Sequence, residues 1–152
     1  MKKLITNSSQ NIETWRKRLM LVIIAAGLVV TVYLLTKSGD PNSVACSLGG
    51  HCAEVLTSKY AKLFGYPISA YGLFWYLASL ILVWFTFFQK ILRERFLAVW
   101  MLGGLGFVFY MTGIEAFILH SYCTWCLATA GLTTALFLLF FVRKNIVKKV
   151  LA

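Results

Sequence analysis

Four long apolar runs dominate this sequence and leave little chain for anything else. They cover roughly residues 19–36, 70–88, 96–119 and 123–142. The hydrocarbon core of a bilayer is about 30 Å thick and each helical residue rises about 1.5 Å, so a spanning helix needs about 20 apolar residues. The four runs meet that length. We therefore expect an all-α integral membrane protein in which four transmembrane helices form a bundle.

The distribution of charge predicts how these helices are oriented. The chain has 152 residues, 60% of them hydrophobic and 13% charged, yet its net charge is +10. Twelve of the fifteen Lys and Arg residues lie in the tails 1–18 and 143–152 or in the connection 89–95, and three lie in the segment 37–69. Cytoplasmic loops are enriched in Lys and Arg. We therefore expect the membrane domain to cover residues 19–142, and the basic tails 1–18 and 143–152 to lie in the cytoplasm. The charge is then a topology signal and does not indicate nucleic acid binding.

All four cysteines fall near the other, outer ends of the expected helices. Cys46 and Cys52 lie in the outer loop, whereas Cys123 and Cys126 open the fourth run as Cys-Thr-Trp-Cys. The outer face of a bacterial inner membrane and the lumen of the endoplasmic reticulum both permit disulfides. At a helix N-terminus the dipole favours a thiolate, which is the nucleophile of disulfide exchange. Two adjacent glycines make the first pair flexible, so we expect it to reach both a soluble partner and the second pair.

The order of these features resembles the vitamin K epoxide reductase (VKOR) family, in its bacterial disulfide-forming branch without a fused thioredoxin-like domain. A first span is followed by a loop cysteine pair, and a Pro-x-Ser-x-x-Gly motif leads into the second span. The C-x-x-C pair then opens the fourth span. The matching residues of the loop and the motif are Cys52, Ser58, Phe64, Gly65, Pro67, Ser69 and Gly72.

The resemblance implies a membrane thiol-disulfide oxidoreductase that uses a quinone, either ubiquinone or menaquinone, as electron acceptor. It implies a separate thioredoxin-like (DsbA-like) partner in the periplasm or outside the cytoplasm, whose reoxidation supports disulfide formation in secreted proteins. The protein would then lie among the lipids of a bacterial inner membrane, with its cysteines on the non-cytoplasmic face.

The resemblance also implies a role for each cysteine. Cys46 and Cys52 would form the loop disulfide, and Cys46 would meet the partner protein. Cys52 would exchange with Cys123, and Cys126 would be the thiolate that faces the quinone. Electrons would pass in pairs from the partner dithiol through the loop pair and the C-x-x-C pair to the quinone.

The resemblance further implies that the quinone ring would lie among Leu56, Ile68, Cys126 and Ala130. Vertebrate members carry an Asn and a Tyr at the positions of Ile68 and Ala130. This departure argues against vitamin K epoxide chemistry and leaves simple quinone reduction intact. Glu115 is the ionisable residue that lies well within an expected span. Intramembrane acids are costly and are therefore functional candidates, so Glu115 is a candidate for a proton role in quinol formation. It lies about one helical turn from the outer end, and reaching the interface is the alternative.

Other interpretations remain at this point. A DsbB-type enzyme has the same chemistry, but its quinone-linked C-x-x-C precedes the substrate-facing pair, the reverse of the order here. A non-catalytic membrane bundle with structural disulfides and an exporter of reductant running the same path backwards are further alternatives. A zinc site is not expected, because five residues separate the first two cysteines and structural zinc sites use C-x₂₋₄-C spacing.

Overall fold

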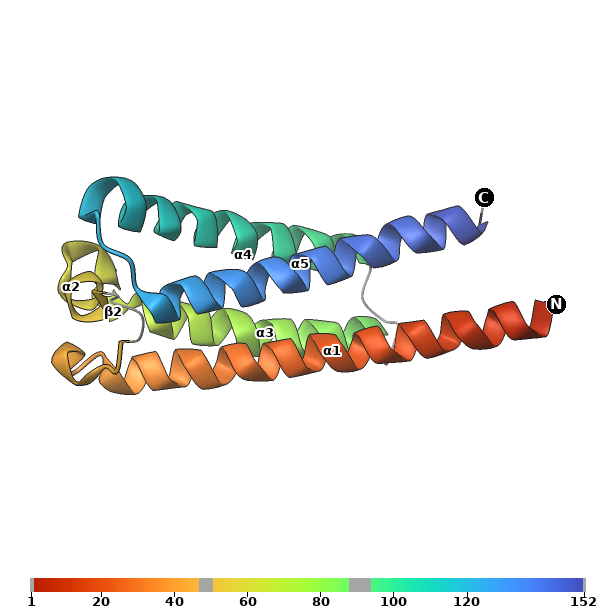
Figure 1. The fold of residues 1–152 in the computed structure, drawn as a ribbon, viewed down its shortest axis with the longest axis horizontal. Helices are drawn as coiled ribbons and strands as arrows, with labels where there is room; N and C mark the ends of the chain where they lie inside the picture. Colours follow the sequence, from red (N-terminus) through yellow and green to blue (C-terminus); the bar gives the residue numbers. More distant parts are fainter. Residues whose placement is uncertain (1, 47–50, 88–93, 152) are drawn as a thin grey trace.

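Four long helices lie side by side in the computed structural model, which describes residues 2–46, 51–87 and 94–151 (Figure 1). Each contains a segment long and apolar enough to cross a membrane. The expected all-α bundle of four membrane-spanning helices is therefore confirmed. The helices are α1 (Lys2–Lys37), α3 (Ile68–Phe87), α4 (Glu94–Ile114) and α5 (Thr124–Leu151).

The first and last long helices, α1 and α5, extend beyond their apolar runs. Helix α1 includes most of the basic N-terminal tail, and its candidate span is Thr14–Lys37; α5 continues past its span, Thr124–Val142, through the basic C-terminal tail. Lys and Arg favour helix, so charge ends the apolar segment without ending the helix. The start of α1 and the end of α5 lie at one end of the bundle, and α2 lies at the other (Figure 1). Residues 88–93 and 47–50 lie outside the described residues. The first range holds the end of the second apolar run and much of the basic connection that follows it, and the second holds the two adjacent glycines.

The loop expected over 37–69 contains several short elements. A two-residue antiparallel hairpin pairs Lys62 with Pro67 and Leu63 with Tyr66. Its turn uses Phe64 and Gly65, whose φ angles are both positive, at 52° and 86°. In chain order the elements are η1 (Pro41–Ser43), α2 (Cys52–Thr57), η2 (Lys59–Ala61), β1 (Lys62–Leu63) and β2 (Tyr66–Pro67).

Helix α3 is held against its neighbours by one buried aromatic side chain, Tyr76. Its ring lies so close to Gly27 of α1 that a Cβ at that glycine would overlap it. Its hydroxyl contacts α5, at 3.0 Å from Thr133 Oγ1 and 3.2 Å from the Thr129 carbonyl, to which it donates. Small residues allow such close approach of membrane helices. Tyr76 therefore contacts both α1 and α5 from its place on α3.

A wider turn ends the third span. After α4 the chain forms the π-helical segment η3 (Glu115–Leu119), which ends at His120 in the left-handed conformation, φ 50°. The Ser121 N–H donates to the Glu115 carbonyl at 3.2 Å and closes this turn. Single π turns occur frequently at functional sites. Here the turn brings the chain back to α5 through only a few residues and leaves the Glu115 side chain buried.

Candidate active site

The loop cysteines Cys46 and Cys52 form a disulfide. Cys52 begins α2 and is buried, at 1% exposure, whereas Cys46 is partly exposed. The Cys52 N–H donates to the Cys46 sulfur at 3.2 Å. The two sulfurs therefore differ in access: Cys46 lies toward solvent and Cys52 toward the protein interior.

The C-x-x-C cysteines Cys123 and Cys126 are free thiols at the start of α5. Cys123 precedes the span by one residue and is completely buried; Cys126 is partly buried. A hydrogen bond from the Cys126 thiol lowers the pKa of Cys123 below its ordinary value, against the opposing effect of burial. A thiol with a lowered pKa is a better leaving group in disulfide exchange.

Both cysteine pairs meet in one buried cluster. Cys52, Val55 and Cys123 form its interior. Cys46 and Cys126 are partly buried and pack against that interior. The structure thus brings together all four cysteines that the sequence singled out, with one member of each pair at the centre.

An aromatic clamp, formed by Tyr33 and Trp125, holds the backbone just before Cys46. The Trp125 indole N–H donates to the Ala45 carbonyl at 2.8 Å, and the Ala45 N–H donates to the Tyr33 hydroxyl at 3.2 Å. The two rings lie 5.1 Å apart. Trp125 was visible in the sequence only as an aromatic residue between two cysteines, and no signal there identified its backbone partner.

Glu115 points into the bundle. It is 5% exposed, its Oε2 accepts the Cys123 N–H at 3.3 Å, and its side chain hydrogen-bonds with the Cys126 thiol. The Glu115 side chain is therefore directed at the start of α5 and not at the surface of the bundle. The π turn explains why, since it places the carboxylate beside the start of α5.

A cavity of about 580 Å³ opens beside Cys126. Its wall is mostly apolar and includes Leu56, Ile68, Ala130 and Glu115, so all five residues proposed for this region line one space. Ligand pockets typically measure about 300–1,000 Å³ and are mainly apolar with a few polar groups. The volume and chemistry suit an apolar small molecule adjacent to the Cys126 thiol.

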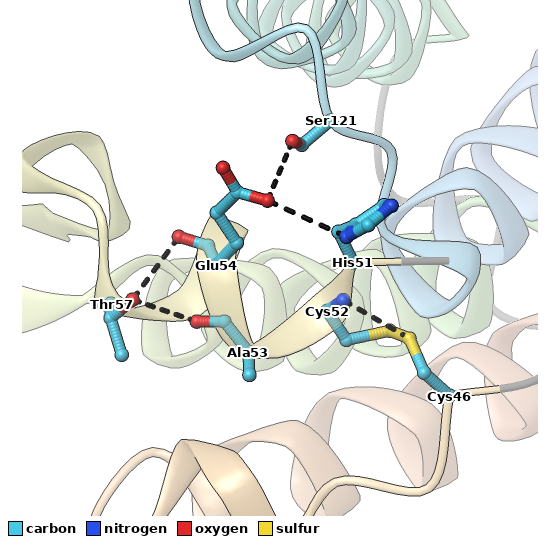
Figure 2. Close-up of polar contacts among 7 residues, drawn as sticks. All are labelled: Cys46, His51, Cys52, Ala53, Glu54, Thr57 and Ser121. Carbon is cyan, nitrogen blue, oxygen red and sulfur yellow. Dashed lines mark hydrogen bonds and ion pairs between the residues drawn. A yellow bond between two sulfur atoms is a disulfide. The ribbon is translucent and has the colours of Figure 1, made fainter. Parts of the chain in front are cut away.

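A polar cluster that sequence reasoning missed joins α2 to the connection before α5 (Figure 2). The Ser121 hydroxyl donates to Glu54 Oε2 at 2.8 Å, and His51 Nδ1 lies 3.6 Å from the same oxygen. The His51 N–H donates to the Tyr122 carbonyl at 3.0 Å. These partners are far apart in the chain, and nothing in their local sequence indicates that they pair.

Comparison with known proteins agrees with this geometry. The family model described as Vitamin K epoxide reductase family matches residues 18–141. The match includes all four apolar spans almost in full and both cysteine pairs. This chain therefore belongs to the Vitamin K epoxide reductase family of membrane thiol-disulfide oxidoreductases.

Proposed function

We propose that this protein reoxidises a separate thioredoxin-like partner and passes the electrons to a membrane quinone, ubiquinone or menaquinone. The partner would in turn oxidise secreted proteins. In this proposal the protein lies in a bacterial inner membrane with both termini in the cytoplasm and the cysteines on the other face. The observation that carries the proposal is the packing of a loop disulfide and a reduced C-x-x-C pair in one cluster, with Cys52 and Cys123 buried at its centre and Cys126 on the wall of an apolar cavity.

Electron transfer between the two pairs needs two exchanges. The partner first reduces the loop pair. The Cys52 thiolate then attacks Cys123, so that the Cys52–Cys123 bond forms, the Cys123–Cys126 bond breaks and Cys126 leaves with the electron pair. The Cys46 thiolate next attacks Cys52, and Cys123 leaves as a thiolate, a step favoured by its lowered pKa. The products are the loop disulfide and the reduced C-x-x-C pair, as in this structure.

The cavity residues fit a quinone as the acceptor. The Ser69 hydroxyl and the Trp75 indole N–H belong to residues of the cavity wall, and neither has a hydrogen-bond partner within the described part of the chain. Buried donors without partners are costly, and a quinone has carbonyl oxygens that accept hydrogen bonds. Oxidation of the dithiol to a disulfide releases two electrons and two protons. Glu115, which contacts the Cys126 thiol, is positioned to receive one of these protons.

The relay is tested with purified protein, a reduced thioredoxin-like protein and short-chain ubiquinone or menaquinone, with quinol formation followed by absorbance. We expect Cys126→Ala to abolish turnover and Thr57→Ala, on the exposed side of α2, to leave it unchanged. Turnover that survives Cys126→Ala would reject the relay. Absence of any thiol exchange in the unmodified protein would favour a non-catalytic bundle.

The proton role is tested by Glu115→Gln. The amide preserves an acceptor for the Cys123 N–H but does not take up a proton at neutral pH. We expect slower oxidation of the reduced C-x-x-C pair by quinone, together with normal exchange between the loop pair and the partner. Unchanged quinone turnover would contradict the proton role of Glu115.

The location of the quinone is tested by filling the cavity. Ala130→Leu adds bulk to the wall beside Cys126, and we expect it to raise the KM for quinone. Ala128→Leu is the matched control, because Ala128 lies on the exposed face of the same helix. Equal KM values for the two variants would argue that the quinone binds elsewhere.

A further inference from the structure

The polar cluster in Figure 2 joins the two elements that carry the exchanging sulfurs. Helix α2 begins at Cys52 and includes Glu54. The connection before α5 includes Ser121 and ends at Cys123. The Ser121–Glu54 hydrogen bond, 2.8 Å long, therefore links a residue two positions after Cys52 to a residue two positions before Cys123.

A second contact runs parallel to the first. The backbone N–H of His51 donates to the Tyr122 carbonyl at 3.0 Å, so the residue before Cys52 bonds to the residue before Cys123. The two contacts flank Cys52 along the chain and both reach the segment just before Cys123. They restrain α2 in position and in rotation.

Apolar packing alone does not supply this restraint. Val55 packs beside Cys52 and Cys123 in the buried cluster, but apolar contact is non-directional. Hydrogen bonds require short distances and near-linear geometry. Sulfur-to-sulfur attack also demands a particular alignment. The polar contacts are therefore the part of this interface that can set the alignment.

We infer that Glu54 and Ser121 are positioning residues, which dock α2 so that Cys52 faces Cys123 during disulfide exchange. This inference rests on the proposed function. The Glu54 side chain is 59% exposed, so water competes for it and the docking is reversible. Reversibility suits a loop pair that must also meet a soluble partner. His51 contributes less, because its contact with Glu54 is 3.6 Å and its side chain is 67% exposed.

The inference is tested in a Cys46→Ala background, where the mixed disulfide is not resolved. The three remaining cysteines of the oxidised protein allow three different disulfides, and acid quenching, alkylation and peptide mapping give the ratio of Cys52–Cys123 to Cys123–Cys126. Cys52–Cys123 requires α2 to be docked. We expect Glu54→Ala and Ser121→Ala each to lower its proportion relative to Cys123–Cys126 about tenfold, equivalent to about 1.4 kcal/mol.

Three comparisons accompany this measurement. The double variant should lose no more than either single one, because both remove the same bond. Glu54→Gln keeps an acceptor for the Ser121 hydroxyl and should retain most of the original ratio. Thr57→Ala is the control on the same helix: its hydroxyl donates to the Ala53 and Glu54 carbonyls at 2.8 and 3.2 Å, within α2 (Figure 2).

The outcomes are distinguishable. An unchanged disulfide ratio in Glu54→Ala and Ser121→Ala overturns the inference, even if both variants melt at a lower temperature. An equal change in Thr57→Ala also overturns it, since that result would reflect helix stability. If the Cys46→Ala protein forms no Cys52–Cys123 disulfide at all, the proposed relay itself fails, and the positioning role falls with it.

Discussion

The aromatic clamp on Ala45 predicts how easily the loop disulfide becomes accessible. Trp125→Phe retains an aromatic ring beside Tyr33 but removes the N–H that donates to the Ala45 carbonyl. A neutral hydrogen bond contributes about 1 kcal/mol of net stability. Its loss should increase the population of the released segment about fivefold, since that free energy corresponds to this ratio near room temperature.

The assay is reduction of the Cys46–Cys52 disulfide in detergent micelles by a water-soluble phosphine. Thiols are counted over time by the gel shift of a polymer-linked maleimide, which separates two free thiols from four. Cys52 is 1% exposed, so attack on its sulfur depends on local opening. The partly exposed Cys46 sulfur can be attacked without opening, so we expect Trp125→Phe to raise the reduction rate by at most about fivefold, the factor by which opening increases.

Tyr122→Phe is the control, because Tyr122 is a half-exposed aromatic residue at the same end of the bundle. A reduction rate that is unchanged in Trp125→Phe would refute the reasoning. Equal acceleration in Tyr122→Phe would refute it too, because the effect would then come from general loosening of this end. Tyr33→Phe should accelerate reduction as well, since it removes the acceptor of the Ala45 N–H.

Further predictions concern the packing that supports the cavity. Gly27→Ala places a methyl group against the Tyr76 ring and should lower the free energy of unfolding by about 1–3 kcal/mol. Gly103→Ala is the control: its methyl group meets open space, so it should change the free energy of unfolding little. Unfolding in mixed micelles measures both variants, and equal effects would contradict the packing argument. Tyr76→Phe should cost about 1 kcal/mol in the same assay, because it removes the bond to Thr133; a neutral result would show that this bond adds nothing to stability. Gly104→Val should destabilise the protein more than Gly103→Ala, because its side chain would overlap the Trp75 ring, and a smaller loss than in Gly103→Ala would argue against close packing there.

Local signals explain why so much was predictable. Hydropathy summed over about 20 contiguous residues determines whether a segment crosses a bilayer, so the four spans follow from the apolar runs alone. The C-x-x-C pair and the loop pair are likewise visible as spacing, and their order identified the family. Helix ends were less accessible: the basic tails continue α1 and α5 because Lys and Arg suit helix as well as water.

Local sequence patterns were therefore enough to predict a membrane protein with four spans and to single out the two cysteine pairs. Tertiary structure decided which groups surround those cysteines. Glu115 became a partner of both C-x-x-C residues only through a π turn, and Glu54 met Ser121 across 67 positions. Membrane helices of similar hydropathy gain no hydrophobic driving force from one particular contact, so close packing and directional hydrogen bonds select the arrangement. Those selections depend on residues distant in the chain, and no local pattern records them.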